Sequence, residues 1–365
     1  MLNPALYSSI YLYGIILLSF FTAITLSRKG YIQLQKNSHT TIFATVLCLI
    51  LIFFLGQRPA SFLFGDSYLY RHVFNLYKTG AFATTEDAAE WLWAKITYFC
   101  AQNYDTSTYL TIIEAGYFGL ALLACYKLTP QSTLVTFLFF LGAFSTYTYG
   151  VNGIRNGLAC SITLCAIAFL STSHKYLPLA IVLSIAAMGI HRSTLLPVAA
   201  LFASTYFVRS FKTAYYFWIA SIFISLVAGG AVTALFGSLG FDDRFSHYAM
   251  GSIDAGKFSH TGFRWDFLIY SMMPIVLGYY TVIKRGIYDR TYLILLNTYT
   301  LANAFWVMVI RANYSNRFAY LSWFMYPVVL AYPLLKLDIW GPEQGKRLAQ
   351  IMLAQVAFTW IMGLI

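Results

Sequence analysis

Apolar stretches of about 20 residues recur along this chain from end to end. A helix of that length satisfies its own backbone hydrogen bonds and crosses a hydrocarbon core of about 30 Å. No long polar block interrupts these stretches, and only 10% of the 365 residues are charged. Soluble domains carry about 25% charged residues. We therefore expect an all-α, polytopic transmembrane helix bundle that forms one domain over residues 1–365.

The hydropathy pattern predicts about 12 spans. Ten of them lie near residues 5–27, 39–56, 107–126, 132–149, 152–171, 213–236, 265–283, 291–310, 317–336 and 348–365. The other two form a short pair at 176–190 and 194–208. A helix of fifteen residues rises only about 22 Å, which is less than the hydrocarbon core. The break between the two helices should therefore lie at the depth of the membrane.

This break contains His191-Arg192-Ser193. Polar backbone at such depth is tolerated only against protein or a water-filled cavity. Ionisable residues there are candidates for function. The alternative is a histidine satisfied by packing, with Arg192 reaching out to the interface.

Basic residues predict the orientation, because lysine and arginine concentrate in short cytoplasmic loops. One consistent cytoplasmic set is Arg28, Lys29, Lys36, Lys127, Lys175, Arg209, Lys212, Lys284, Arg285, Arg290, Lys336, Lys346 and Arg347. The remaining, outward set is mostly arginine: Arg58, Arg71, Lys78, Lys95, Arg155, Arg192, Arg244, Lys257, Arg264, Arg311 and Arg317. Arginine suits bidentate binding of oxyanions, so we expect the chemistry on the outer face and both termini outside.

Two outer segments are long enough to cap a cavity. They are residues 57–106, with an amphipathic stretch around Glu90 to Gln102, and residues 237–264, rich in glycine, aspartate and histidine. Plain solvated loops are the alternative for both.

Two outer helix starts carry an arginine. In the segment Gly150 to Gly157, Asn152 is predicted to cap a span and Arg155 lies in its first turn. A cation there opposes the helix dipole unless an anion bridges it and the helix amides. The turn from Arg311 to Arg317 repeats the pattern, since Arg317 also begins a span. Arginines that snorkel to the interface are the alternative.

Three further residues stand near the outer ends of spans or within them. Arg58 follows a helix C-terminus, where a cation is favourable, so its presence there indicates little by itself. Asp66 sits in a glycine and tyrosine turn and could be a general base or an ion-pair partner. Glu114 lies inside a span and is expected to pair with a polar neighbour.

Several classes of function are disfavoured. The basic residues bracket spans and form no basic face, so the net charge of +11 does not indicate nucleic acid. The five cysteines show no zinc or disulfide spacing. Asp242-Asp243 has no third ligand at fixed spacing beyond His247, which favours a structural turn. We expect neither a metal nor a cofactor.

These segments together resemble the EpsG family of bacterial polysaccharide polymerases, relatives of the Wzy O-antigen polymerases. The resemblance covers roughly residues 40–335. The residues that carry it are Arg58, Gly65-Asp66, Tyr68, Glu90, Asn152-Gly153-Ile154-Arg155-Asn156-Gly157-Leu158-Ala159, His191, Ser193 and Asn316-Arg317-Phe318-Ala319-Tyr320. Two positions depart from the family pattern: Asn156 stands where glutamine is frequent, and Gly65-Asp66 lacks an intervening threonine.

The resemblance implies transfer of undecaprenyl-diphosphate-linked oligosaccharide repeat units, extending O-antigen or a similar surface polysaccharide. The protein would lie in the bacterial inner membrane as a GT-C-like bundle, with a large cavity and its active site facing the periplasm. Its partners would be the lipid-linked oligosaccharides and the bilayer, and a chain-length regulator protein is a candidate partner.

Each candidate residue then has a predicted role. Asp66 or His191 would accept the proton of the acceptor hydroxyl. Arg58, Arg155, Arg311 and Arg317 would bind the diphosphate. Secondary substrate contacts would come from Tyr68, Glu90, Asn152, Arg192, Arg264 and Asn316.

Two alternatives remain open. A lipid-linked oligosaccharide flippase would carry arginines along both halves of a central cavity. A glycosyltransferase that uses polyprenyl-phosphate sugars would favour an acidic pair and a metal in the first outer segment.

Overall fold

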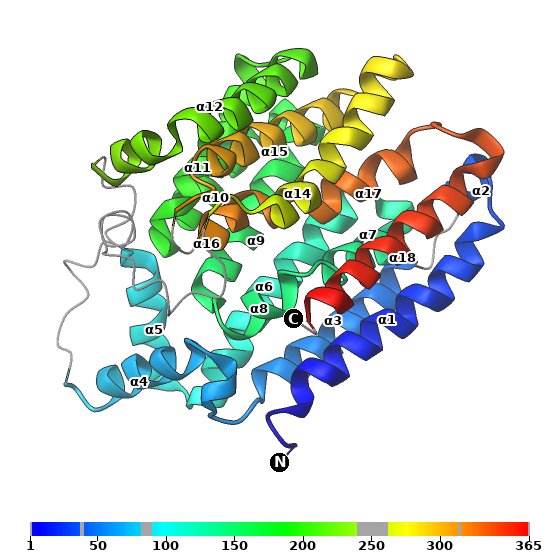
Figure 1. Cartoon of the computed structure of the whole chain (residues 1–365). Helices are drawn as coiled ribbons and strands as arrows, with labels where there is room; N and C mark the ends of the chain where they lie inside the picture. Colours follow the sequence, from blue (N-terminus) through cyan, green and yellow to red (C-terminus); the bar gives the residue numbers. More distant parts are fainter. Residues whose placement is uncertain (1, 37–39, 82–89, 239–261, 313–314, 364–365) are drawn as a thin grey trace. The chain divides into compact units, whose positions relative to one another are not determined.

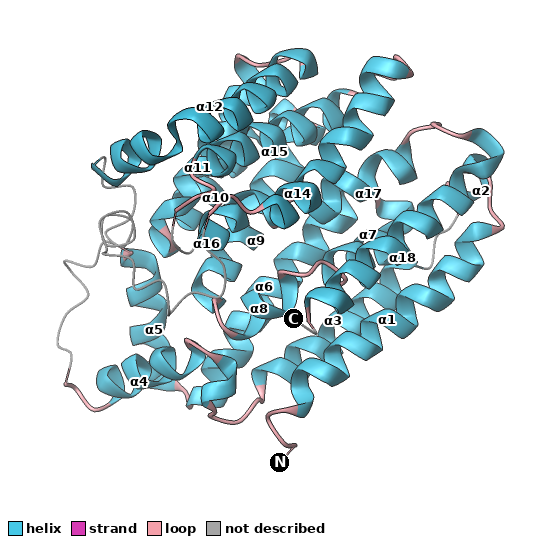
Figure 2. Cartoon of the chain, in the orientation of Figure 1, coloured by secondary structure: helices cyan, strands magenta, loops and turns pink. Residues whose placement is uncertain are grey.

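The computed structural model describes residues 2–36, 40–81, 90–238, 262–312 and 315–363, of which the side chains of 233–238 and 315–316 are not placed. All regular structure in these ranges is helical (Figure 2). They divide into two compact units, residues 1–191 with 331–365, and residues 192–330. Asp242, Asp243 and His247 lie outside the described residues.

The first unit contains most of the helices. They are α1 (Leu6–Ser27), α2 (Tyr31–Leu34), α3 (Thr40–Gly56), α4 (Ser67–Lys78), α5 (Trp91–Asn103), α6 (Thr106–Leu128), α7 (Thr133–Leu141), α8 (Thr146–Val151), α9 (Ile154–Thr172), α10 (Leu177–Ile190) and α18 (Gln344–Met362). The second unit contains α11 (Leu195–Tyr206), α12 (Phe211–Ser238), α14 (Trp265–Gly278), a π-helix (Tyr279–Lys284), α15 (Arg290–Met308) and α16 (Ser315–Trp323). Helix α17 (Tyr326–Lys336) crosses the boundary between the units.

Six helical segments within the described residues are long and apolar enough to cross a membrane. They are Leu6–Ser27, Thr106–Leu128, Ile154–Thr172, Phe211–Val232, Trp265–Lys284 and Arg317–Lys336. Three shorter apolar helices are Thr40–Gly56, Pro130–Leu141 and His174–Ile190. The prediction of a helical membrane protein is therefore confirmed, although fewer described helices reach full length than the 12 spans expected.

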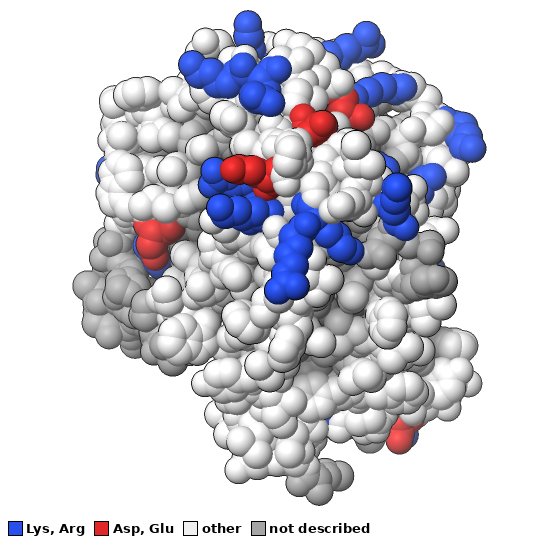
Figure 3. Space-filling view, turned by 90° about the vertical axis from the view of Figure 1, so that its right-hand side faces the viewer, with Lys and Arg blue, Asp and Glu red and all other residues white. Residues whose placement is uncertain are grey.

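Basic side chains gather in clusters on the face drawn in Figure 3, and a wide area of that face carries no charge. Around the connections that flank α2 and α18, the exposed basic residues include Arg28, Lys36, Lys346 and Arg347. This distribution is typical of loops that flank membrane spans.

The predicted break within the short helix pair is confirmed. Helix α10 ends at Ile190, and a single 3-10 turn from Arg192 to Thr194 leads into α11. His191 has an extended backbone, with φ −149° and ψ 110°. The length of the apolar run was sufficient to locate this break.

The prediction of one span over 132–149 was wrong, because α7 ends at Leu141 and α8 begins at Thr146. A helix end normally leaves four carbonyls without intrahelical partners. Here side chains of α8, α1 and α18 donate to consecutive carbonyls, an arrangement that we term the α7 carbonyl cap. The bonds are Gln355 Nε2 to Phe139 O (2.6 Å), Thr146 Oγ1 to Phe140 O (2.6 Å), Tyr11 OH to Leu141 O (2.7 Å) and Thr359 Oγ1 to Gly142 O (2.7 Å). Such donors make a helix end tolerable inside a hydrocarbon layer.

Two other predicted spans are also less regular than expected. The span over 317–336 is interrupted between α16 and α17, and α12 is kinked at Ala228, directly before Gly229 and Gly230. A non-helical residue beside two glycines is a common cause of a kink.

Helix α9 forms the centre of the first unit. It packs against α6 and α10, and it is buried along most of its length. Its small residues, among them Gly157, Ala159, Ala166 and Ala168, allow neighbouring helices to approach closely. Helix α3 packs on α6, and α1 and α18 run side by side in opposite directions (Figure 1).

Candidate functional site

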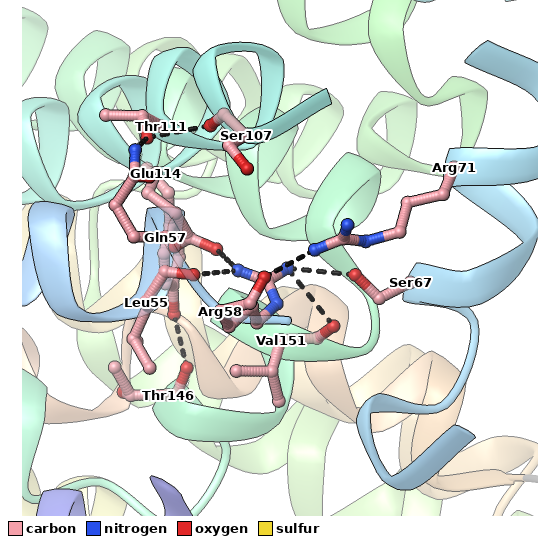
Figure 4. Close-up of polar contacts among 11 residues, drawn as sticks. Leu55, Gln57, Arg58, Ser67, Arg71, Ser107, Thr111, Glu114, Thr146 and Val151 are labelled. Atoms are coloured by element: carbon pink, nitrogen blue, oxygen red, sulfur yellow. Dashed lines mark hydrogen bonds and ion pairs between the residues drawn. The ribbon is translucent and has the colours of Figure 1, made fainter. Parts of the chain in front are cut away.

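A fully buried arginine joins the ends of three helices in the first unit. The Arg58 side chain is 0% exposed, and its Nη1 lies 2.6 Å from Glu114 Oε1 on α6. Nη1 also donates to Leu55 O at the end of α3 (2.6 Å). Nη2 donates to Ser67 Oγ at the start of α4 (3.0 Å) and points toward Val151 O at the end of α8 (3.5 Å). Figure 4 shows the guanidinium at the centre of these groups.

Arg71 completes this group, which we term the Arg58 cluster: Arg58, Ser67, Arg71 and Glu114. Arg71 Nη2 donates to the backbone carbonyl of Arg58 (2.6 Å). Burial, and then the nearby charge of Arg58, lower the pKa of Arg71 from its ordinary value. The predicted pairing of Glu114 with a polar neighbour is confirmed. Arg58 was predicted to bind substrate, yet its side chain is enclosed by protein.

The turn that carries Asp66 is locked to the start of α9. Asp66 N donates to Asn152 Oδ1 (2.7 Å), and Gly65 has a positive φ of 57°. A Cβ at Gly65 would collide with the Asn152 side chain, whose Cγ would lie 2.6 Å away. The prediction that Asn152 caps the following helix was wrong: Gly153 holds the N-cap position of α9, and the Asn152 amide is engaged by Asp66 instead.

Gly65→Ala is expected to weaken this turn for two reasons, since alanine is strained at positive φ and its Cβ would displace Asn152. We expect a loss of about 1 to 3 kcal/mol of stability. The melting temperature of the purified protein in detergent measures it. Gly80→Ala is the matched control, because Gly80 also has positive φ (73°) but a Cβ there meets nothing within 4 Å. Equal losses in both variants would contradict the contact with Asn152.

A second polar group brings together three residues far apart in sequence, which we term the Glu90 triad. Glu90 Oε2 accepts a hydrogen bond from Arg155 Nη1, and Glu90 Oε1 lies 2.7 Å from His191 Nδ1. The three side chains are partly buried, with 19%, 16% and 14% of their surface exposed for Glu90, Arg155 and His191.

Glu90 occupies the N-cap position of α5 but does not cap it. An acceptor side chain at this position usually bonds the first amides of its own helix, a contact worth about 1 kcal/mol. The Glu90 carboxylate is instead directed to α9 and to the end of α10. A residue that forgoes a local stabilising bond for distant charged partners is a candidate for function.

Close helix packing places His191 beside Glu90. A Cβ at Gly189 would lie 2.9 Å from the Trp91 ring and 3.0 Å from Leu92 Cβ, so the end of α10 approaches the start of α5 as closely as glycine permits. Arg155 lies in the first turn of α9, as predicted. Two helix starts, those of α5 and α9, and one helix end, that of α10, therefore converge on the triad.

The EpsG family model matches residues 41–361. The chain belongs to the EpsG family. This family is of the Wzy-like polymerase type, so the chain is a polysaccharide polymerase-type membrane protein. No curated protein and no solved structure matches it.

In this EpsG-family protein, the other predicted site residues belong neither to the Arg58 cluster nor to the Glu90 triad. Tyr68 is exposed and its ring lies 4.3 Å from that of Phe62. In the second unit, Arg264 forms a two-pronged ion pair with Asp266, through Nε (2.9 Å) and Nη2 (2.6 Å), and stacks on Phe267. Arg192 is exposed in the turn before α11.

The remaining two arginines also lie in the second unit. Arg311 is exposed at the end of α15, and its side chain passes Gly229 at the kink of α12, where a Cβ would lie 3.2 Å from Arg311 Cδ. Arg317 is exposed in the first turn of α16. The side chain of Asn316 lies outside the described residues.

Ser67 and Arg71 were not predicted to be site residues, although Arg71 was assigned to the outward basic set. Both lie in α4, which was expected to be part of a loop, although the amphipathic stretch that became α5 was predicted. The repeating polar and apolar residues from Ser67 to Lys78 are the signal that could have identified α4.

Proposed function

We propose that this EpsG-family protein polymerises undecaprenyl-diphosphate-linked oligosaccharide repeat units, by metal-independent glycosyl transfer at the periplasmic face of the bacterial inner membrane. Family membership supports a polymerase-type role. The observation that carries the mechanism is the Glu90 triad, which joins a histidine base candidate to an arginine anion site through one carboxylate.

His191 is the base in this proposal. Its Nδ1 lies within hydrogen-bond distance of Glu90 Oε1, and a carboxylate only accepts, so Nδ1 carries the proton. In the neutral ring, Nε2 then has the lone pair that can accept a proton from the acceptor sugar hydroxyl. Glu90 also stabilises the imidazolium that forms. Asp66 is the second candidate, because the described residues provide no hydrogen bond or ion pair to its carboxylate.

Arg155 stabilises the leaving group. As the acceptor oxygen bonds to the anomeric carbon, the bond from that carbon to the phosphate oxygen breaks and its electrons remain on the diphosphate. A guanidinium at the start of a helix, beside the helix amides, is suited to that developing charge. Arg155 Nε is buried without a hydrogen-bond partner among the described residues, and such a donor favours an arriving acceptor oxygen.

Other parts of the proposal rest on the sequence. Arg311 and Arg317 are further candidates for the diphosphate, and Tyr68, Asn152, Arg192, Arg264 and Asn316 for secondary substrate contacts. The predicted fold has about 12 spans in one domain, a GT-C-like arrangement and a large periplasmic cavity. The lipid-linked oligosaccharides are the substrates, and a chain-length regulator is the candidate partner.

Purified protein incubated with a lipid-linked repeat unit in detergent tests the proposal. Wild type should produce a ladder of polymer lengths, also with EDTA present. Arg155→Ala should lower the rate by about 10²-fold or more, the typical cost of removing one charge-stabilising donor. Arg155→Lys should recover little of it, because lysine lacks the planar fork.

The matched control is Arg347→Ala, since Arg347 is an exposed arginine that contacts Glu343 on the surface of α18. It should retain the wild-type rate. If folded wild-type protein makes no ladder, the flippase would be favoured, because a flippase translocates the same substrate without joining units. A ladder that requires a divalent metal and a polyprenyl-phosphate sugar would favour the other alternative.

A further inference from the structure

The ion pair between Arg58 and Glu114 is fully buried, although burying an ion pair adds little net stability. Both side chains are at most 1% exposed, and their contact is 2.6 Å. Removing two charges from water costs much of what their attraction returns, so a well-packed apolar pair at such a place is often equally stable. Arg58 Nε and Glu114 Oε2 also have no hydrogen-bond partner within the described residues.

The pair is arranged to hold several segments in place at once. Glu114 projects from the middle of α6 and fixes the guanidinium. The guanidinium in turn contacts Leu55, Ser67 and Val151, as Figure 4 shows. Only the planar fork of arginine presents donors in these several directions from one rigid group.

Two of these contacts, Ser67 and Val151, are direct sequence neighbours of the candidate site residues Asp66 and Asn152. Ser67 follows Asp66, whose amide bonds Asn152, and Val151 precedes Asn152. Three residues after Asn152 comes Arg155, which bonds Glu90. A shift of the Arg58 guanidinium would therefore be transmitted to the turn that begins α9 and to Arg155 itself.

We propose that Glu114 and Arg58 are positioning residues for the polymerisation site. Glu114 orients Arg58, and Arg58 sets the position of the Asp66 turn and of the start of α9. Neither residue contacts substrate. The proposal rests on the function proposed above and replaces direct diphosphate binding by Arg58.

Two variants separate positioning from simple stabilisation. Glu114→Ala alone would leave a buried unpaired charge and lose folded protein, so it does not discriminate. Arg58→Met/Glu114→Leu removes both charges and keeps the volume, so it should fold. Arg58→Lys keeps the ion pair but loses the fork. Both should lower kcat by at least 10-fold with KM changed by less than 3-fold.

The matched control applies the same changes to an exposed pair, as Arg347→Met/Glu343→Leu. It should retain the kcat of wild type. If either buried-pair variant folds with a wild-type melting temperature and a wild-type kcat, the positioning role is wrong.

Hydrogen exchange provides a readout that does not need substrate. In Arg58→Met/Glu114→Leu, amides of residues 60–68 and 152–156 should exchange at least 10-fold faster, while those of α18 stay unchanged. Unchanged exchange in both segments would overturn the positioning role. If the wild-type protein makes no ladder, the proposed function is wrong. Hydrogen exchange is then the one measurement that still tests whether Arg58 and Glu114 position the Asp66 turn and the start of α9.

Discussion

Glu90→Gln is expected to lower the polymerisation rate by about 10² to 10⁴-fold, the range associated with a general base. The Glu90 carboxylate accepts a hydrogen bond from Arg155 Nη1 at Oε2 and another from His191 Nδ1 at Oε1. Glutamine has one acceptor oxygen and one NH₂ group, so it can accept from only one of them. If its NH₂ faces His191, the imidazole must present Nδ1 as the acceptor and carry its proton on Nε2, which removes the base.

The rate in the ladder assay, per amount of folded protein, measures this effect. Asp105→Asn is the matched control, because Asp105 is an exposed carboxylate that caps α6 by accepting from Thr108 N (2.7 Å). Asparagine caps helices as well as aspartate does, so that variant should keep its activity. A Glu90→Gln protein with a wild-type rate would rule out the proposed role of the triad.

Gly345→Ala is expected to destabilise the protein by about 3 kcal/mol, from overpacking and the loss of a buried hydrogen bond. Gly345 is the second residue of α18, and its amide donates to Lys29 O, two residues after the end of α1 (3.0 Å). A Cβ there would collide with the carbonyl oxygens of Leu26 and Lys29. These are backbone atoms, so they cannot move aside as the end of a flexible side chain can.

Thermal unfolding in detergent, followed by loss of the monodisperse peak in size-exclusion chromatography, measures this loss. Gly14→Ala is the control, since a Cβ at Gly14, in the middle of α1, meets nothing within 4 Å. Alanine has a higher helix propensity than glycine, so this variant should be at least as stable as wild type. If Gly345→Ala has the same melting temperature as wild type, α1 and α18 can move apart at this point without loss of stability, and the prediction is wrong.

Sequence reasoning worked where the signal is local. The break at His191 followed from the length of two apolar runs, and the position of Arg155 in a first turn followed from the residues around it. It failed where distant side chains decide the structure. The end of α7 depends on Tyr11, Gln355 and Thr359, so no pattern within 132–149 could reveal it.

The candidate site shows the same division. Glu90, Arg155 and His191 were each singled out, but the carboxylate that joins them is 65 residues from Arg155 and 101 from His191. Nothing in periodicity or spacing indicates such a contact. Arg58 was correctly placed after a helix C-terminus, whereas its burial depends on a partner 56 residues away on α6.

The α7 carbonyl cap also has a consequence for biogenesis. Two of its donors, Gln355 and Thr359, lie 216 and 217 residues beyond the carbonyls that they bond, so they leave the ribosome long after α7 has done so. Until then, the carbonyls of Phe139 and Gly142 lack these partners. A chain that ends before α18 therefore keeps unpaired polar backbone at the end of α7, which is costly in a hydrocarbon layer.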